Sequence, residues 1–375
     1  MIVAIITAVS PSVVGSHRTS LGLQVVSHDP FFTEVSGWLR SEGYRSRSFR
    51  LLDDRDSEGL SVPRTLLAVR SHRSLLVLHL LPTPCSTAAT LPASSTASLT
   101  EAFSRRRHSL VHLWEDQWME HSHIVRSRLL AKLGRSMRVF ARKTEARRID
   151  AAALDAFLLE NHLWGSTKAR YRYGLFRRIN RLALDEGAGG EPREELVAVA
   201  SFSARWKVRR RRGGATEGGE GGEGGEGGEG SGEAAPRASH ELIRYCSLRG
   251  ESVVGGITKL IAAFARDAHP DEIVTVIDRD WGEGGGWSTL GFRPLKQLPP
   301  VRFYIGPDGR RCHLGGGPNP HRRRLPAELA AAVEQLDTPE EVERFLASHR
   351  YFPVHDAGAE RHLLQVTPLP GDGLD

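Results

Sequence analysis

The sequence predicts an α/β (α+β) fold, built as a mixed sheet with flanking helices. Short runs of apolar and β-branched residues, such as 273–278, are typical of strands, and longer stretches with apolar residues at helical spacing, such as 150–161, are typical of helices. The two kinds of segment alternate along 375 residues, a length that allows two domains or three small ones. Apolar residues make up 39% of the chain, which is enough for a buried core.

The N-terminal third predicts a small α/β unit. Residues 1–60 carry no clear pattern, whereas 64–81 alternates as strand, polar turn and strand. Residues 82–100, rich in Pro, Thr, Ser and Ala, are predicted as a loop. A short strand is expected at 110–114.

Three later helices have recognisable ends. In the helix predicted over 122–134, Ser122 is the expected N-cap and Gly134 the expected stop. Asp150 can cap a helix that runs to about residue 161. Thr338, Pro339 and Glu341 form a capping box with proline at the first helical position.

A larger sheet is predicted on both sides of a low-complexity linker. Residues 213–235 are almost only Gly, Glu, Ala and Ser, which cannot form a packed core, so we interpret them as part of a disordered insertion in one domain. The elements expected around it are strands at 137–142, 171–176, 196–202, 241–247, 273–278 and 301–305, a hairpin turn at 185–193, loops at 248–254 and 279–286, helices at 255–268, 287–290 and within 326–349, and a terminal hairpin of 351–355 with 362–366.

Charge and cysteine content narrow the function classes. The formal net charge is +6 even with the glutamates of the linker, and a basic surface favours phosphate-bearing partners or reflects an arginine-rich composition alone. The three cysteines are widely spaced, which indicates no disulfide framework and no cysteine-rich metal site. No run reaches the roughly 18 apolar residues of a membrane span. We therefore expect an intracellular protein with no membrane association, in a compartment that the sequence does not resolve.

A glycine pair begins the helix after the 241–247 strand. Backbone N–H groups at a helix start, together with the helix dipole, can hold a pyrophosphate, and glycines allow the close approach. An ordinary strand-to-helix turn with glycines for packing is the other interpretation. The residues that would form such a phosphate loop are Val253, Val254, Gly255, Gly256, Ile257 and Thr258.

The order of segments around this turn resembles the GNAT family of N-acetyltransferases. The blocks ELIRYCSL, VVGGITKLI, EIVTVID and WSTLGF carry the resemblance, which covers about residues 138–305. It implies a splayed pair of parallel strands that admits the pantetheine arm of acetyl-CoA, with the pyrophosphate on the loop and helix start just described. Where the family commonly has a basic first loop residue and a small third one, this chain has Ser252 and Ile257, and Trp287 stands where many members have a tyrosine acid.

The block DRDWGEGG begins at the end of the predicted 273–278 strand and continues as a glycine-rich loop. Functional side chains often lie in such loops. Asp278, Arg279 and Trp281 are therefore our candidate catalytic residues, and an Asp–Arg pair that only fixes the loop is the alternative. His162 and Trp164 begin the loop after the 150–161 helix and can line the same cleft.

Five blocks also resemble phage-type homing-endonuclease-like proteins, in which a Vsr-like nuclease domain precedes a GNAT-like module. The first block, HLWEDQWMEHSH, begins at residue 112. Nucleases of this kind need acids that hold a divalent metal, and the 66–81 hairpin has none. Glu115 and Asp116 follow on a strand end, where neighbours point to opposite faces. We expect a degraded nuclease and no bound metal.

Three basic runs favour nucleic-acid binding, although each is also typical of a solvated surface. Trp206 lies among cations and can stack on a base. The third run is 105–107, and the residues expected to bind from the other two are Arg205, Trp206, Lys207, Arg209, Arg210, Arg322, Arg323 and Arg324.

The sequence thus predicts a degenerate Vsr-like region at 1–137, a GNAT-like domain at 138–310 with an insertion at 209–238, and a basic helical tail with a terminal hairpin at 311–375. The first functional hypothesis is an acetyl-CoA-binding, N-acyltransferase-like protein with a degenerate cofactor loop. The alternative is a non-catalytic nucleic-acid-binding protein derived from a homing endonuclease, and an active metal-dependent endonuclease ranks last.

Overall fold

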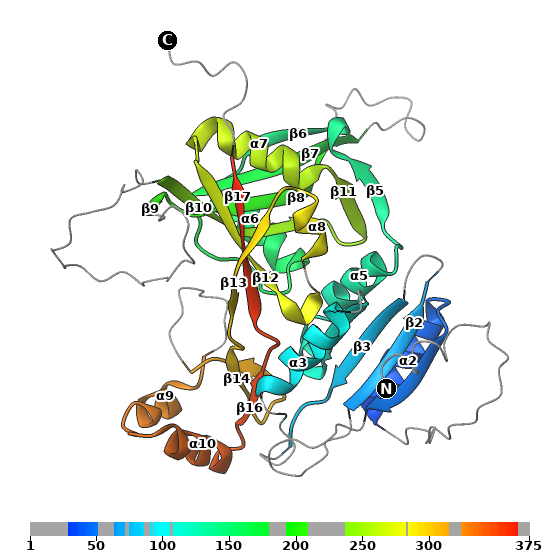
Figure 1. Ribbon diagram of the computed structural model, residues 1–375, viewed down its shortest axis with the longest axis vertical. Coiled ribbons are helices and arrows are strands. Elements are labelled where there is room, and N and C mark those ends of the chain that lie inside the picture. Colours follow the sequence, from blue (N-terminus) through cyan, green and yellow to red (C-terminus); the bar gives the residue numbers. More distant parts are fainter. Residues whose placement is uncertain are drawn as a thin grey trace.

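The computed structural model describes residues 29–51, 64–71, 75–85, 91, 93–105, 108–179, 193–208, 237–282, 284–314 and 324–366. Within them the protein has the mixed α+β content that the sequence predicts, with helices on several mixed sheets (Figure 1). In this described part, no helix is both long and apolar enough to cross a membrane.

A four-stranded sheet forms the N-terminal unit within the described residues. Its strands are β1 (Ser46–Leu51), β2 (Arg64–Arg70), β3 (Leu75–Leu81) and β4 (Ser109–Trp114), and its helices are α2 (Pro30–Ser41), α3 (Ala93–Ser104), α4 (Glu115–Glu120) and α5 (Ser122–Lys132). The predicted β2–β3 hairpin and the strand β4 are confirmed, with β2 and β3 antiparallel and β4 parallel to β3. The sequence patterns missed α2, although Asp29 caps it in the ordinary way by accepting from the N–H of Phe31.

The loop predicted over 82–100 is partly wrong, because α3 begins at Ala93. This helix buries Thr96 and Thr100 beside Leu99 and Phe103, so its buried face is not apolar in sequence. The Thr96 hydroxyl donates to the carbonyl of Asp356, 3.0 Å away. The buried Thr96 hydroxyl is therefore satisfied by a carbonyl 260 residues later in the chain. A search for apolar periodicity does not detect a helix that is buried through such contacts.

The start of α5 also differs from the prediction. His121 is its N-cap and Ser122 is the first helical residue, whereas Gly134, with φ of +81°, ends the helix as predicted. Glu115 and Asp116 are not on a strand end, because they begin α4.

The second and larger sheet has the strand order β13-β17-β12-β10-β8-β7-β6, with β9 also paired to β10. The bounds are β6 (Thr144–Arg148), β7 (Tyr171–Ile179), β8 (Arg193–Phe202), β9 (Trp206–Val208), β10 (Arg237–Ser247), β12 (Glu272–Asp278), β13 (Arg293–Leu298) and β17 (Ala359–Gln365). Strands on both sides of the linker belong to this one sheet. Because β10 begins at Arg237, the last two residues of the predicted insertion are part of a strand.

Two helices pack on opposite faces of the larger sheet. The predicted helices are confirmed as α6 (Ala151–Asn161), which Asp150 caps through the N–H of Ala153, and α7 (Gly256–Ala268). Phe202 of β8 packs in the core under α7, and Val199 of the same strand packs with α6, as expected from the alternation of side chains along a strand.

The parallel neighbours β10 and β12 separate part-way along their length. They pair from Ser239 with Glu272 to Leu242 with Thr275, after which β10 runs on to Ser247 without β12. A register shift between Leu242 and Arg244, relative to β8, coincides with the end of this pairing.

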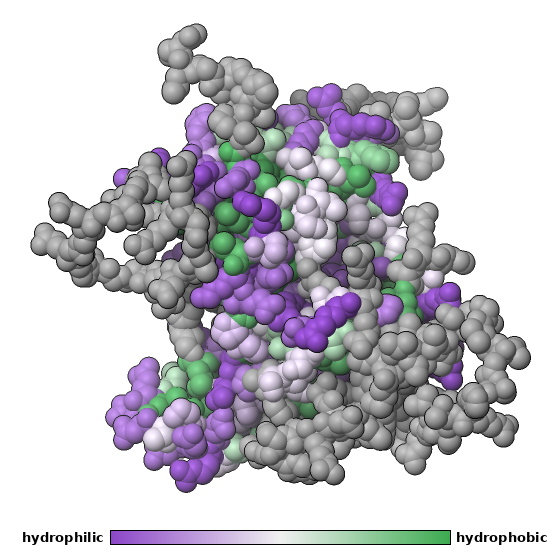
Figure 2. Space-filling view, viewed as in Figure 1, coloured by the Kyte–Doolittle hydropathy of each residue, from purple (hydrophilic) through white to green (hydrophobic). Residues whose placement is uncertain are grey.

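Smaller elements complete the structure. They are β5 (Met137–Phe140), η2 (Ala141–Lys143), β11 (Glu251–Val254), η3 (Arg279–Trp281), α8 (Gly285–Ser288), β14 (Arg302–Ile305), β15 (Arg311–Cys312), α9 (Ala327–Val333), α10 (Pro339–Ser348) and β16 (Phe352–His355). The loop predicted at 248–254 contains β11, which pairs in parallel with β5. Strand β13 was not predicted, while α9, α10 and the Thr338 capping box are confirmed. Mainly hydrophilic residues cover the corner that α9 and α10 form (Figure 2).

The terminal hairpin predicted for the end of the chain is wrong. Strand β16 pairs with β14, and β17 lies between β12 and β13 in the large sheet. The segment predicted as a tail from residue 311 thus supplies a strand to the sheet.

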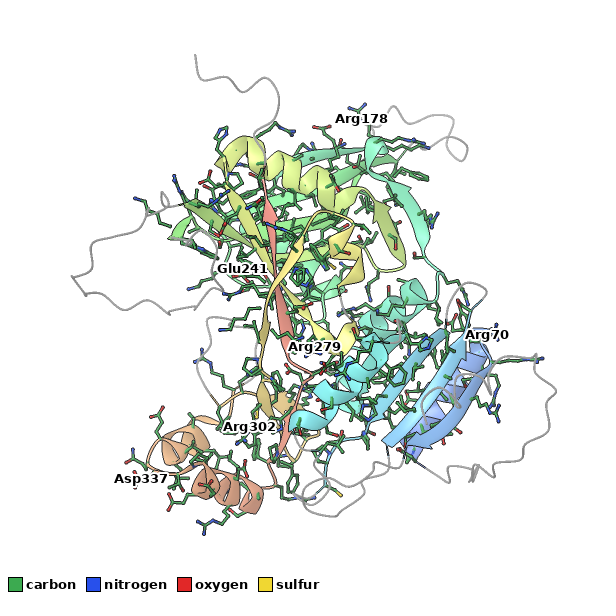
Figure 3. The ribbon with its side chains drawn as sticks, viewed as in Figure 1. Arg70, Arg178, Glu241, Arg279, Arg302 and Asp337 are labelled. Carbon is green, nitrogen blue, oxygen red and sulfur yellow. The ribbon has the colours of Figure 1, made fainter. Side chains whose placement is uncertain are left out.

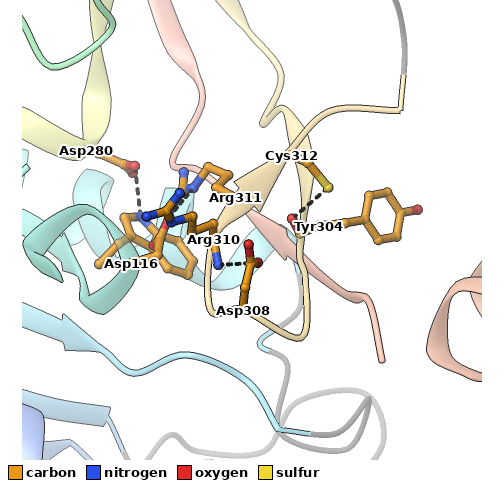
Figure 4. A network of polar contacts seen from close by, with 8 residues as sticks. Asp116, Asp280, Tyr304, Asp308, Arg310, Arg311 and Cys312 are labelled. Carbon is orange, nitrogen blue, oxygen red and sulfur yellow. Dashed lines mark hydrogen bonds and ion pairs between the residues drawn. The ribbon is translucent and has the colours of Figure 1, made fainter. Parts of the chain in front are cut away.

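A buried ion pair joins the N-terminal unit to the segment between β14 and β16 (Figure 4). Arg311 of β15 donates to Asp116 of α4 from Nε (2.9 Å) and from Nη2 (3.1 Å), and the two side chains are only 8% and 4% exposed. The guanidinium carbon lies 4.9 Å from the ring centroid of Trp114, whose Nε1 donates to Asp280 at 3.0 Å. Three distant parts of the chain meet at this point.

Replacing Asp116 with Asn should lower the free energy of unfolding by about 3 kcal/mol, because Arg311 would then be a buried cation without its carboxylate. Glu343→Gln is the matched control, since it breaks the exposed pair of Glu343 with Arg302 and should change stability by less than about 0.5 kcal/mol. Urea unfolding measures both. Equal losses of unfolding free energy in the two variants would show that the buried pair stabilises the fold no more than the exposed pair does.

Candidate functional site

A cavity of about 850 Å³ lies where β10 and β12 separate. The diverging strands line it with Leu242, Tyr245, Thr275 and Asp278, among others. Other walls come from α5 and β4 of the N-terminal unit, from the loop after α6, from the loop before α8 and from residues within 298–303 and 356–359, so the N-terminal unit and the large sheet share the cavity.

Glu241 lines this cavity from β10, near the middle of the molecule (Figure 3). Burial raises the pKa of its carboxyl above the usual range, and Arg361 and Arg244 oppose that shift without removing it. The side chain makes no hydrogen bond or ion pair within the described residues. A half-buried carboxyl with a raised pKa and no fixed partner is suited to exchanging protons with a ligand.

Tyr245 follows on the same strand and joins the cavity to the start of α7. Its hydroxyl accepts from the backbone N–H of Ile257 and lies 3.5 Å from the hydroxyl of Ser247. Burial raises the pKa of Tyr245 above its usual range, so the phenol is a weaker acid than an exposed tyrosine. A phenol hydroxyl remains a hydrogen-bond donor.

His162 and Trp164 line the cavity as the sequence analysis expected. The Nδ1 atom of His162 accepts from the backbone N–H of Trp164 at 3.1 Å, which leaves the proton of the neutral ring on Nε2. Burial, with Arg244 and Arg128 nearby, holds the pKa of His162 well below its usual range. The indole Nε1 of Trp164 donates to Asp278 at 3.1 Å.

Two of the three candidate catalytic residues, Asp278 and Trp281, line the cavity, whereas Arg279 does not. Asp278 also caps η3, because it accepts from the N–H of Asp280 at 2.9 Å. Trp281 is 4% exposed and lies under the guanidinium of Arg128, 4.0 Å from ring centroid to Cζ. A catalytic role for the three residues stays a prediction.

The residues of the predicted phosphate loop lie at the start of α7 and do not line the cavity. Val253 and Ile257 are buried in the core, and a Cβ on Gly256 would lie 2.9 Å from the side chain of Val253. Gly255, with φ of +76°, and Thr258 are exposed. Val254 is 46% exposed. Gly256 is thus required for packing, while the exposed turn stays open to a ligand.

The basic residues predicted to bind nucleic acid are only partly described. Arg205 and Lys207 are exposed around Trp206, which is 37% exposed on β9. Arg324 is exposed beside an isolated bridge to His313. Arg209, Arg210, Arg322 and Arg323 lie outside the described residues. Nucleic-acid binding stays a prediction.

The N-terminal unit holds its carboxylates in structural contacts. Glu115 accepts from the N–H of Thr83 at 2.6 Å, and Asp116 is paired with Arg311. Among the described residues, no group of three or more His, Cys, Asp or Glu side chains is placed to hold a metal ion.

Comparison with known proteins gives no further guide to this site. No protein-family model matches the sequence, and no curated protein matches it significantly.

Stability should depend on pH through His162. Its pKa is lower in the folded than in the unfolded chain, so the unfolded chain takes up the proton first as the pH falls below about 6.5, and stability is lost. Between pH 7.5 and pH 5 the wild type should lose about 1–2 kcal/mol more than His162→Asn, by urea unfolding. His349→Gln, at an exposed histidine, should behave as the wild type. Identical losses in wild type and His162→Asn would contradict the assignment.

Proposed function

We propose that the protein binds an acyl thioester of coenzyme A, such as acetyl-CoA, in the cleft between β10 and β12. The observation that carries the proposal is the end of pairing at Leu242 and Thr275, where two parallel strands diverge over a cavity of about 850 Å³. Strands that separate direct their backbone N–H and C=O groups into the gap, and an amide-containing arm such as pantetheine can pair with them.

The connection between the two strands supports the same proposal. The short strand β11 and then helix α7 connect β10 to β12, and a helix in this connection agrees with the resemblance to GNAT-type acetyltransferases. Val254, Gly255 and Thr258 are exposed at its start and are the positions we assign to the pyrophosphate. Tyr245 already engages the N–H of Ile257, so that group is not available to a phosphate.

Two side chains in the cleft suit acyl transfer to an amine. The thioester supplies an activated carbonyl carbon, to which the amine nitrogen bonds while the carbon–sulfur bond breaks. Glu241 takes the proton that the nitrogen releases, for which a raised pKa is favourable. Tyr245 gives its hydroxyl proton to the leaving sulfur, and the proton that Glu241 has taken returns to Tyr245 through water, so both side chains end in their starting protonation states.

Calorimetric titration with acetyl-CoA tests the binding, and a cleft-filling variant makes the test specific. Gly286 lines the cavity, and a Cβ added there meets nothing within 4 Å, so Gly286→Leu should fold normally and weaken binding at least about tenfold. Gly37→Leu on α2 is the matched control, because that glycine also has open space around it. Absence of binding heat for the wild type at millimolar ligand would refute the proposal.

Removing the base should lower the rate without preventing binding. Glu241→Gln is expected to reduce acetyl transfer to a primary amine about 100-fold, the ordinary contribution of a general base. Thiol release from acetyl-CoA with a panel of primary amines measures the rate, and Glu340→Gln on the exposed start of α10 is the control. Equal rates of acetyl transfer for Glu241→Gln and the wild type would show that Glu241 is not the general base.

A further inference from the structure

The cavity wall includes a guanidinium for which no hydrogen-bonding or ion-pair partner is found in the described part of the chain. Arg128 of α5 lines the cavity, and its guanidinium carbon lies over Trp281, 4.0 Å from the ring centroid. Within the described residues it makes no hydrogen bond and no ion pair. Burial lowers the pKa of this half-buried side chain, and the negative charge of Asp278 opposes that shift.

Two other arginines in the described part also lie over tryptophan rings, and both have a carboxylate. Arg126 of the same helix, 4.7 Å from the Trp118 centroid, pairs with Glu34 at 3.5 Å. Arg311, over Trp114, pairs with Asp116. Of the three arginines that stack on tryptophan in the described part, Arg126 and Arg311 also have a carboxylate partner. Arg128 stacks on tryptophan without an ion pair to any described residue.

The neighbours of Arg128 add donors and positive charge. Arg244 and Lys132 line the same cavity, and the Lys132 ammonium lies next to Gly282. His162, within electrostatic range of both arginines, offers its Nε2 proton. Asp278, whose charge acts on Arg128, already accepts from Trp164 and from the backbone of η3. Asp356, also in the wall, accepts from the N–H groups of Val301 and Gly358.

We propose that Arg128, Arg244 and His162 form a binding site for an anionic group, a carboxylate or phosphate, carried by the acyl acceptor. The planar fork of Arg128 is held by Trp281 and matches two oxygens of either anion. The identity of the ligand as the acceptor rests on the proposed function, whereas the anion site itself does not. The site also requires the N-terminal unit, since Arg128 comes from α5 and the other two residues from the large sheet and the loop after α6.

The full-length chain can be titrated with inorganic phosphate and, separately, with acetate, using calorimetry. At least one anion should bind at millimolar concentration, and the anion that binds identifies the group. Arg128→Gln should weaken this binding roughly ten- to hundredfold, as expected for a hydrogen-bonded charge. Arg126→Gln is the matched control, because it removes a stacked arginine from the same helix outside the cavity, and it should bind as the wild type does. Should Arg128→Gln fail to fold, Arg128→Lys keeps the charge and should still weaken binding at least threefold.

Two results would overturn the anion site: no binding of either anion up to 20 mM (about tenfold above the expected range), or equal binding by wild type and Arg128→Gln. A loss of acetyl-CoA affinity in Arg128→Gln as large as the loss of anion affinity would overturn the assignment to the acceptor. The proposed function fails separately, when the wild type binds the anion but gives no heat with acetyl-CoA.

Discussion

The pair of Arg311 with Asp116 is the interaction on which the arrangement of the cavity walls depends. It fixes β15 against α4, and through Trp114 it holds Asp280, which also accepts from the N–H of Ala357 at 2.8 Å. Burial, with Asp278 and Asp356 nearby, raises the pKa of Asp280 well above its usual range. A buried carboxyl of this kind is tolerated because two donors satisfy it, and it locks the loop between β12 and α8 to the N-terminal unit.

Local patterns predicted the elements whose stability is local. The β2–β3 hairpin, α6 and α7 combine strong periodicity with recognisable ends, and they occur close to the expected residues. Strand β11 escaped prediction because its partner β5 lies more than a hundred residues earlier, and α3 escaped because its buried face carries threonines. The false hairpin of β16 and β17 has a similar cause, since neighbouring strands in sequence were assumed to pair.

The candidate site was predictable to the same limited extent. Asp278, Trp281, His162 and Trp164 were found because glycine-rich and aromatic loops follow strands or helices there. Glu241 and Tyr245 were not, since in ELIRYCSL they look like ordinary residues of a strand, and only the divergence of β10 from β12 turns them toward a cavity. Arg128 lies in a helix with no distinguishing pattern, and its importance comes from having no hydrogen-bonded carboxylate among the described residues.

Several side chains of the cavity wall are held in place by their neighbours. A ligand that enters a cleft between two units loses affinity if it must first order their side chains. Here Trp164 is fixed by Asp278, Asp278 caps η3, and η3 ends with the buried Trp281 that orients Arg128. Trp164, Asp278 and Arg128 are thus each held by a neighbouring residue, whereas the Glu241 side chain is not held by any described residue. The ion pair between Arg311 and Asp116 therefore also preorganises the site. A ligand that binds there does not have to offset the entropy cost of ordering these side chains.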